Sequence, residues 1–382
     1  MRDGESTGAA GQHGDGSAYR LAGVDYTTLD AGKRLALSRA LDTSSFMSAR
    51  GGTAVDASRG EPAFVFELDG RSFAFVVEGL GTKSVIARQV AEVLGVNRFA
   101  DVAYDTVAAI VNDLCCVGAL PLVVNAYFAT GSGDWYRQQD WHAELLDGWH
   151  RACADAGATW GGGESPTLPD LVAASDIELA GSAIGALPLG ARPILGDELG
   201  PGDEIVIVPS SGLHANGASL ARRVAGRVPD GYATLLPSGR TFGEALLDPS
   251  RLYARLVERL SEERLPVTYL SHITGHGLLK LMRPMKELTY EIHTLPEVPE
   301  VFDLLVNDAQ LRPAAAYSTF NMGCGFAVYC RAGYGESVAA AARHAGHDPV
   351  LAGVVRRGPR RVVLSPVGVT YESGELRLSP DG

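Results

Sequence analysis

The stretch Val77-Glu78-Gly79-Leu80-Gly81-Thr82-Lys83 joins a predicted strand to a predicted helix through a glycine turn. The strand is predicted over residues 72–77, a β-branched and aromatic run, and the helix over residues 84–94, where apolar residues recur at helical spacing. This order aims backbone N–H groups and a helix N-terminus at one point, which attracts anions, and Lys83 adds a positive charge. The turn is a candidate phosphate site. Because the long spacing of a Walker A loop is missing, an ordinary strand-to-helix turn remains the alternative.

The composition predicts a globular protein of about two domains. The chain has 382 residues, of which 46% are hydrophobic and 20% charged, enough for a sizeable core. Its net charge of -12 argues against nucleic acid as a main partner, because a phosphate backbone needs a basic surface. No apolar run reaches the roughly 18 residues of a membrane span, and the N-terminus lacks a signal pattern. We therefore expect no nucleic-acid partner and no membrane.

The cysteines argue for a reduced protein. There are five, an odd number, and no two are spaced as C-x-x-C. Cys115 and Cys116 lie in an apolar helical run, where they are expected to pack as small hydrophobic side chains. Neither a disulfide framework nor a zinc site is predicted, and we expect a cytoplasmic location.

Four segments are predicted along the chain. Residues 1–18 are rich in Gly, Ser and acidic residues and are expected to form a disordered leader, and residues 371–382 a flexible tail. Between them, residues 19–188 are the predicted first domain and residues 189–370 the second. A Pro- and Gly-rich stretch, residues 187–202, is the expected joint.

Strands and helices alternate in the first domain, which predicts an α/β protein of the α+β type. Residues 47–62 carry several glycines and small polar residues and are expected to be a mobile loop. Further helices are expected at 101–118, 136–157, 217–224 and 246–260, and strands at 120–128, 177–185, 204–208, 326–329 and 361–364.

Five further motifs follow the glycine turn in a fixed order. They are Val111-Asn112-Asp113, Gly161-Gly162-Gly163-Glu164-Ser165, Ser210-Ser211-Gly212-Leu213-His214-Ala215-Asn216-Gly217, His272-Ile273-Thr274-Gly275-His276-Gly277 and Thr319-Phe320-Asn321-Met322-Gly323. In this order the set resembles the aminoimidazole ribonucleotide synthetase (phosphoribosylformylglycinamidine cyclo-ligase) family. The likeness runs from about Tyr19 to about Pro366, nearly the whole chain.

The resemblance implies a fold, an activity and an assembly. The family has two domains, each with a mixed sheet flanked by helices, and its members are homodimers whose active site lies between the subunits. They use ATP and Mg²⁺ to phosphorylate the amide oxygen of formylglycinamidine ribonucleotide, a phosphorylated small molecule. An amidine nitrogen then closes the imidazole ring and phosphate leaves. No enzyme nucleophile is needed, which agrees with the lack of a Ser-His-Asp or Cys-His arrangement in the sequence.

ATP use calls for phosphate donors and for oxygen ligands of Mg²⁺. Asp105 and Asn112 are seven residues apart, about 700° of helical rotation, and therefore share a face of the predicted helix. A cap or a surface charge is the alternative for the acidic residues, but an Asn-Asp pair inside an apolar helix is costly to bury without a partner. The expected phosphate donors are Gly79, Gly81, Thr82 and Lys83, and the expected oxygen ligands are Glu78, Asp105, Asn112 and Asp113, with Glu78 and Asp113 on the metal.

Other site residues are carried over from the resemblance. Glu164 and Ser165 correspond to an acidic residue and a hydroxyl beside the nucleotide, although a plain loop is the default for such a glycine cluster. The family usually has Asp where this chain has Glu78 and Asn125, so a metal role for Asn125 is in doubt. It more often has Gly in place of His276, which either lines the pocket or fills a loop. The 47–62 loop also differs from the family's glycine-rich loop.

In the second domain, a strand ends and a helix begins at residues 210–217. Backbone amides and hydroxyls that converge at a helix start suit a ribose phosphate. Simple N-capping needs only one such residue, and this turn has six. We expect Ser210, Ser211, Gly212, His214 and Asn216 to bind the substrate, and Lys83, Asp113 and His214 to be catalytic.

Two other functions fit the same residues. One is a paralogous ATP-dependent cyclase or amide-activating enzyme that acts on a different substrate in specialised metabolism. The other is a nucleotide-binding paralogue without catalysis, which the presence of Lys83, Asn112, Asp113 and Glu164 disfavours.

Overall fold

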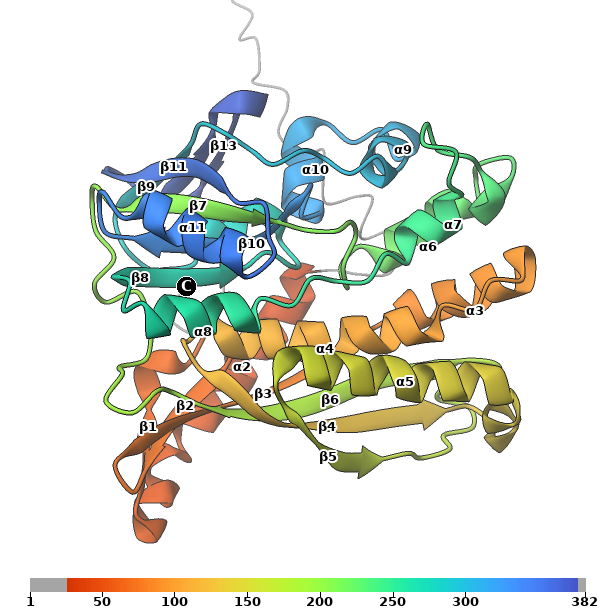
Figure 1. The fold of residues 1–382 in the computed structure, drawn as a ribbon, viewed down its shortest axis with the longest axis horizontal. Helices are drawn as coiled ribbons and strands as arrows, with labels where there is room; N and C mark the ends of the chain where they lie inside the picture. Colours follow the sequence, from red (N-terminus) through yellow and green to blue (C-terminus); the bar gives the residue numbers. More distant parts are fainter. Residues whose placement is uncertain (1–25, 377–382) are drawn as a thin grey trace, which may run out of the picture.

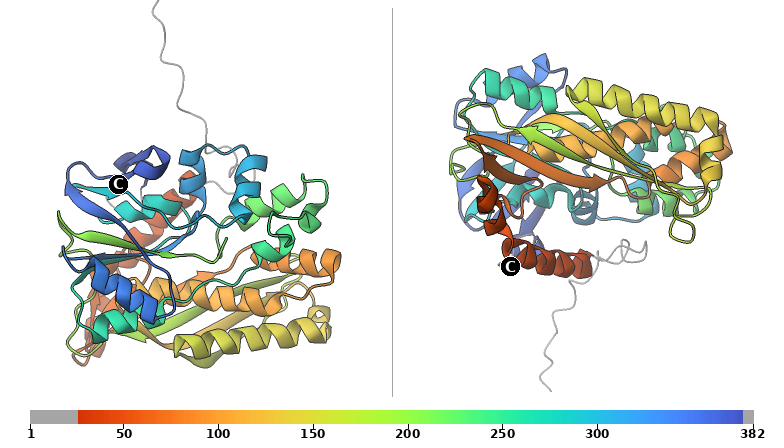
Figure 2. Two further views of the ribbon diagram at one scale, coloured as in Figure 1. Left: turned by 45° about the horizontal axis from the view of Figure 1, so that its top comes forward. Right: turned by 90° about the horizontal axis from the view of Figure 1, so that it is seen from below.

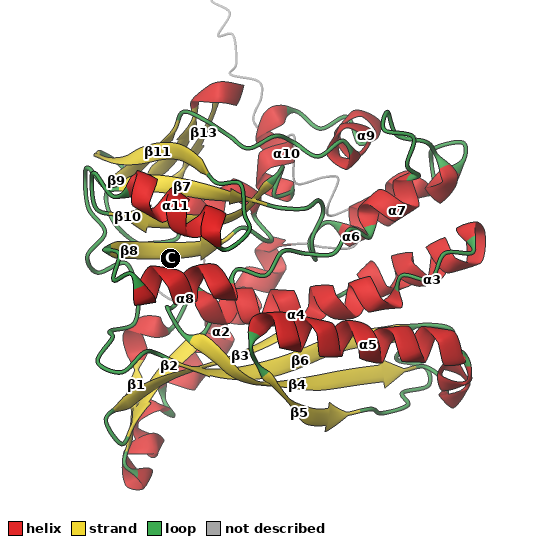
Figure 3. Cartoon of the chain, viewed as in Figure 1, coloured by secondary structure: helices red, strands yellow, loops and turns green. Residues whose placement is uncertain are grey.

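Two β-sheets lie on either side of a layer of helices in the computed structural model, which describes residues 26–376 (Figure 1). The predicted leader, residues 1–18, lies outside the described part of the chain. Figure 3 shows the same layers coloured by type of element. Within residues 26–376, no helix is both long enough and apolar enough to cross a bilayer.

The first sheet has six strands in the order β1-β2-β3-β6-β4-β5. Neighbouring strands are antiparallel except for β4 and β5, which are parallel, so the sheet is mixed. Helices α3, α4 and α5 cover one face. The bounds are β1 (Gly52–Val55), β2 (Phe64–Leu68), β3 (Arg71–Gly79), β4 (Leu120–Thr130), β5 (Thr159–Glu164), β6 (Ile177–Ala186), α2 (Tyr26–Leu41), α3 (Lys83–Leu94), α4 (Phe99–Cys115) and α5 (Gln139–Ala156).

The second sheet has seven strands in the order β13-β12-β9-β11-β7-β10-β8 and is also mixed, because β12 runs parallel to β9. The predicted fold, two domains each with a mixed sheet flanked by helices, is thus confirmed. The bounds are β7 (Glu204–Pro209), β8 (Val267–His272), β9 (Leu288–Ile292), β10 (Cys324–Cys330), β11 (Val350–Arg357), β12 (Arg361–Leu364), β13 (Val369–Glu372), α6 (Ala218–Ala225), α7 (Phe242–Leu246), α8 (Ala254–Glu262), α9 (Val301–Asp308), α10 (Pro313–Thr319) and α11 (Gly335–His344).

The two faces of the first sheet have different environments. Along β3, Ala74 and Val76 are buried against the helices, whereas Phe75 and Val77 are 42% and 64% exposed on the other face. In the view from below in Figure 2, no helix of the described residues crosses the middle of this second face. Side chains alternate across a strand, so one face belongs to the core and the other is an open surface that is partly apolar.

Several local predictions are wrong. The expected helix 246–260 is interrupted, because residues 247–253 form a loop between α7 and α8. The expected mobile loop 47–62 contains the 3₁₀ helix η1 (Ser44–Arg50) and strand β1, and the glycines at 161–163 lie in strand β5. Part of the expected flexible tail is also ordered, since β13 extends to Glu372 and the side chains of Tyr371 and Leu376 are buried. Residues 377–382 lie outside the described part.

Helices α4 and α5 approach closely at one glycine, which gives a stability prediction. A Cβ atom on Gly148 of α5 would lie 2.0 Å from the backbone oxygen of Ala100 in α4. We expect Gly148→Ala to lower the free energy of unfolding by about 1–3 kcal/mol, because the helices must separate. The control is Gly32→Ala in α2, where a Cβ meets nothing within 4 Å, so helix propensity should raise the stability by about 0.5–1 kcal/mol. Urea unfolding of both variants tests this, and a stabilised Gly148→Ala would contradict it.

Candidate functional site

A buried ion pair lies at the start of helix α3. Gly81 has a φ of +68°, which allows the chain to turn sharply from β3 into α3. Nζ of Lys83 lies 2.6 Å from Oδ2 of Asp105, and both side chains are 0% exposed. The backbone N–H of Ser250 donates to Oδ1 of Asp105 at 2.6 Å. Burial raises the pKa of Asp105, and the charge of Lys83 opposes this rise. Each buried charge therefore compensates the charge of the other.

Helix α4 is bonded to the second domain through its polar residues. Nδ2 of Asn112 donates to the backbone oxygen of Arg251 at 2.8 Å, and the N–H of Tyr253 donates to Oδ1 of Asn112 at 2.9 Å. Asp105 and Asn112, predicted to share a face, therefore bond to the same part of the loop between α7 and α8, residues 249–253, which we call the 249–253 loop. In this structure the amide of Asn112 joins the two domains.

Next to this contact, charged groups from both domains meet in the interior. Oδ1 of Asp113 lies 2.7 Å from Nδ1 of His272, at the end of β8. Although burial opposes it, the hydrogen bond and charge of His272 lower the pKa of Asp113. Burial, together with the charge of the neighbouring Asp113, raises the pKa of Glu78 to about 7. Burial lowers the pKa of Lys280, which contacts Oγ1 of Thr274, to about 8.

The Glu78–Asp113 pair fits a magnesium ion that is also bound by a phosphorylated ligand. Within residues 26–376, no group of three or more His, Cys, Asp or Glu residues is arranged to hold a metal by itself. Mg²⁺ commonly takes only one or two carboxylates from the protein and completes its shell with phosphate oxygens and water. Glu78 and Asp113 are a suitable pair, because a cation bound nearby would offset the negative charge of Asp113 that contributes to the raised pKa of Glu78. The side chain of Asn125 belongs to the open face of the sheet, away from this pair.

The turn that follows β7 is fixed by internal hydrogen bonds. Oγ of Ser210 donates to Oδ1 of Asn321 at 2.8 Å, and Oγ of Ser211 donates to the backbone oxygen of Pro249 at 2.6 Å. Nδ2 of Asn321 donates to the backbone oxygen of Gly212 at 2.9 Å. Both hydroxyls, expected to face the substrate, are thus used inside the protein. The donors left for a phosphate are backbone N–H groups and the half-buried side chain of Asn216.

His214 has a structural contact that the sequence did not reveal. Its backbone is left-handed, with a φ of +57°, and its ring is buried. Nε2 accepts from the backbone N–H of Ser211 at 3.2 Å and from that of Arg251 at 3.4 Å. Burial holds the pKa of His214 well below its usual value, so the ring is neutral and carries its proton on Nδ1.

The two glycine turns meet across the domain boundary. Oγ1 of Thr82, at the start of α3, lies 3.1 Å from Oγ of Ser219, in the first turn of α6. Two helix N-termini, each preceded by a glycine with positive φ, therefore converge, at Gly81 and at Gly217. Helix N-termini attract anions, so this junction can hold the phosphates of two ligands side by side.

Two of the expected nucleotide residues are not brought to this junction. Glu164 and Ser165 are exposed at the end of the edge strand β5. Strands β6 and β4 separate β5 from β3, which carries Glu78. At about 4.8 Å per strand, the distance across the sheet is roughly 14 Å.

The sequence missed several residues of the site. His272 opens one of the quoted motifs, but its spacing to Asp113 carries no local signal. Lys280 lies in the 3₁₀ helix η5 (Gly277–Met282) within an apolar segment. A single lysine among apolar residues is the one feature of the sequence that marks it. The leucines around the 249–253 loop have helical spacing, so the sequence predicts a helix there instead of a loop.

The comparisons with known proteins agree with this arrangement. Residues 60–187 match the family described as AIR synthase related protein, N-terminal domain, and residues 200–364 match its C-terminal domain. The chain is 36% identical over 291 residues to a phosphoribosylformylglycinamidine cyclo-ligase of Anaeromyxobacter sp. (strain Fw109-5), which covers 74% of this chain and 79% of the relative. It is 32% identical to the protein of that name from Methanobrevibacter smithii, over 73% of this chain and 79% of the relative.

Solved structures resemble the fold at lower identity. Hydrogenase maturation protein HypE in complex with ATP matches with a TM-score of 0.58 and 18% identity, over 78% of this chain and 83% of that one. A structure named AaThiL complexed with AMPPCP and TMP matches with a TM-score of 0.56 and 14% identity, over 82% and 90% of the two chains. At these identities the likeness concerns the fold alone. The two domain matches and the curated relatives together show that this chain belongs to the AIR synthase family, alongside the phosphoribosylformylglycinamidine cyclo-ligases.

Proposed function

We propose that the protein is an ATP-dependent cyclo-ligase of purine biosynthesis. It converts formylglycinamidine ribonucleotide to aminoimidazole ribonucleotide, with ADP and phosphate as the other products. The observation that carries the proposal is the convergence of the two glycine turns at Thr82 and Ser219, close to the carboxyl pair of Glu78 and Asp113. The curated relatives bear the name of this activity. The proposal keeps the cytoplasmic location expected from the sequence.

In this reaction the protein binds and orients two ligands. The N–H groups at the start of α3 hold the phosphates of ATP, and those at the start of α6 hold the substrate phosphate. Glu78 and Asp113 would hold Mg²⁺, which when bound would supply positive charge beside the phosphates. Lys83 and Asp105 fix the start of α3 against α4 and so position the phosphate turn. Catalysis then comes from orientation and charge stabilisation, as in other phosphoryl transfers.

Turnover of the purified protein tests the function. The assay supplies formylglycinamidine ribonucleotide and MgATP and follows ADP and the aminoimidazole product. We expect the two products in equal amounts. Tight MgATP binding without the aminoimidazole product would contradict the proposal. It would favour the paralogous cyclase with another substrate, and ATP binding with no turnover of any amide would favour the non-catalytic alternative.

The division of labour between the turns gives a kinetic prediction. Asn216 is half-buried in the second-domain turn, and its loss removes one or two hydrogen bonds, each worth about 0.5–1.5 kcal/mol and more towards a charged group. We expect Asn216→Ala to raise the KM for the ribonucleotide severalfold and to leave the affinity for ATP unchanged. Kinetics with both substrates varied provide the measurement. A variant that loses ATP affinity but keeps its substrate KM would show that the two sites are exchanged.

The open face of the first sheet supports a homodimer as part of the proposal. Phe75 and Val77 are exposed on it, and a second copy packed on this face would cover them. We expect light scattering to give a dimer at micromolar concentration and Phe75→Glu to shift it towards monomer. The control is Phe46→Glu, a change at a 64% exposed phenylalanine in η1. A wild-type monomer would rule the dimer out.

A further inference from the structure

A cavity of about 320 Å³ lies where the 249–253 loop meets the end of helix α5 and the start of the 345–347 turn. Its walls include Tyr104 from α4, Asp155 from α5, Arg251 and Arg255 from the second domain, and His347. None of these side chains belongs to the residues that we assign to ATP, to the metal or to the ribonucleotide. The volume is in the range of small-molecule sites.

His347 lines this cavity, and its two ring nitrogens are buried without a hydrogen-bond partner in the described chain. The residue is only 7% exposed. The ring packs against Tyr253, with centroids 5.3 Å apart. Burial lowers the pKa of His347 to about 4, so at neutral pH it presents one N–H donor and one bare nitrogen acceptor. A buried polar group normally has a partner, and a ligand in the cavity would supply one if the ring turned towards it.

Arg251 adds a positive charge that no acidic residue neutralises. Its Nε is buried without a partner, and its guanidinium makes no ion pair with any residue of the described chain. The charge is felt by its neighbours, because it contributes to lowering the pKa of both His347 and His214. A permanent guanidinium in this position favours an anion.

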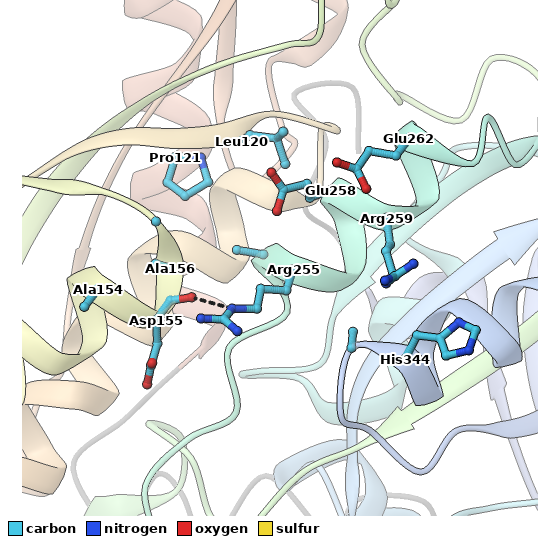
Figure 4. A pocket seen from close by; sticks show the side chains of 13 residues that line it. Leu120, Pro121, Ala154, Asp155, Ala156, Arg255, Glu258, Arg259, Glu262 and His344 are labelled. Carbon is cyan, nitrogen blue, oxygen red and sulfur yellow. Dashed lines mark hydrogen bonds between the residues drawn. The ribbon is translucent and has the colours of Figure 1, made fainter.

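The second arginine is partly engaged and leaves its outer nitrogens free for a ligand. Nε of Arg255 donates to the backbone oxygen of Asp155 at 3.2 Å, as the dashed line in Figure 4 shows, and the carboxylate of Asp155 accepts from the hydroxyl of Tyr104 at 3.0 Å. The acidic side chains of Glu258 and Glu262 line the neighbouring cavity of about 520 Å³. The positive end of the site is therefore at Arg251.

We propose that this cavity binds a phosphate monoester of about nucleotide size, with the phosphate on the guanidinium groups of Arg251 and Arg255. His347 then bonds a hydroxyl or a ring atom of the same ligand. A dianion is preferred over a carboxylate because two arginines line the cavity. No part of this rests on the proposed reaction.

From this location a bound ligand can influence the junction of the two turns through the loop formed by residues 249–253. The backbone of the same loop donates to Asp105 from Ser250, donates to His214 from Arg251 and accepts from Asn112 at Arg251. A ligand that orders the side chain of Arg251 therefore orders the backbone that holds these three residues. The site is regulatory in this sense, since occupancy stabilises one position of the loop.

Hydrogen exchange with ribose 5-phosphate as the probe tests the proposal. We expect millimolar ribose 5-phosphate, but not ribose, to slow amide exchange in the peptide that covers residues 249–255. His347→Phe keeps the ring and removes both nitrogens, and Arg251→Gln removes the charge. Each should raise the concentration needed for half-maximal protection about tenfold or more. Arg259→Gln, on the same helix but outside this cavity, is the matched control and should bind as the wild type does.

The outcomes separate this site from the proposed reaction. Protection of residues 249–255 that is lost in His347→Phe and in Arg251→Gln, and kept in Arg259→Gln, supports the site. No protection there, or protection that both variants keep, overturns it, and so does protection confined to residues 210–217. Because the experiment needs no turnover, a failed cyclo-ligase assay leaves this result intact.

Discussion

Replacing Lys83 by Met lowers the free energy of unfolding by about 3–5 kcal/mol, because it leaves Asp105 as an uncompensated buried charge. Both side chains are fully buried, so neither solvent nor another cation replaces the lost ammonium group. Activity should disappear at the same time, since the pair positions the start of helix α3. Urea unfolding and MgATP titration of the same preparation provide the two measurements.

The double variant separates charge from packing. In Lys83→Met/Asp105→Leu no charge remains, and a well-packed apolar pair often stabilises as well as a buried ion pair. We expect it to recover at least half of the lost stability, with the remainder due to the N–H of Ser250, which loses its acceptor. MgATP binding should recover to a similar extent, because the fully buried pair acts by holding the turn in place. If the single variant unfolds like the wild type, the ion pair does not hold the turn in place.

Replacing Asp113 by Asn has the second largest expected effect, and it falls on function. The substitution keeps the size of the side chain and an oxygen that can face His272, so its cost in stability should be smaller than that of Lys83→Met. It removes one of the two carboxylates beside the proposed magnesium position. We expect MgATP to bind at least tenfold more weakly, since a charge-assisted contact is worth about 1.5–3 kcal/mol. A loss of kcat/KM on the order of 10²–10³ should accompany it.

A surface carboxylate gives the control for Asp113. Glu92, in α3, is half exposed and pairs with Arg88, so Glu92→Gln removes the same charge without touching the junction. It should leave the binding of MgATP within twofold of the wild type. If Asp113→Asn does the same, the metal is held elsewhere and the Asp113–His272 contact serves only to join the domains.

The sequence predicted those elements whose structure depends on local patterns. The strand before Glu78, the glycine turn and helices α3 and α4 follow from apolar spacing and from glycine positions. The 249–253 loop does not, because the leucines from 246 to 260 have helical spacing. The residues that interrupt the helix are distant in sequence. The side chains of Asp105 and Asn112 accept from the N–H groups of Ser250 and Tyr253. In a continuous helix these N–H groups would bond to backbone carbonyls of the preceding turn instead.

Glycines were another source of error. The cluster at 161–163 predicts a flexible turn, yet it is part of strand β5. A Cβ on Gly163 would lie 2.2 Å from the backbone oxygen of Ala126 in β4, so this residue is small because the neighbouring strand is close. A single sequence does not distinguish a glycine needed for backbone flexibility from a glycine needed because a neighbouring strand lies too close for a side chain.

The functional site was predicted in part for a similar reason. Asp105 and Asp113 stand out because a charged residue in an apolar segment needs a partner, and Lys83 because it follows a glycine turn at a helix start. The hydrogen-bond partner of Asp113, His272, comes from the second domain, more than 150 residues along the chain, and nothing local marks it. The internal bonds of Ser210 and Ser211 were equally invisible, because a hydroxyl in a turn looks the same whether it faces a ligand or the protein.

Helix α4 has a thermodynamic consequence for the whole chain. Its apolar side packs against the first sheet, and its polar side is bonded to the second domain through Asp105, Asn112 and Asp113. Melting either domain therefore strands buried polar groups of the other, and the cost couples the two transitions. The chain should absorb heat in one calorimetric peak, and a protein cut within the 187–202 joint should not yield two independently stable halves. The two domains are therefore separate in architecture but unfold together as one cooperative unit.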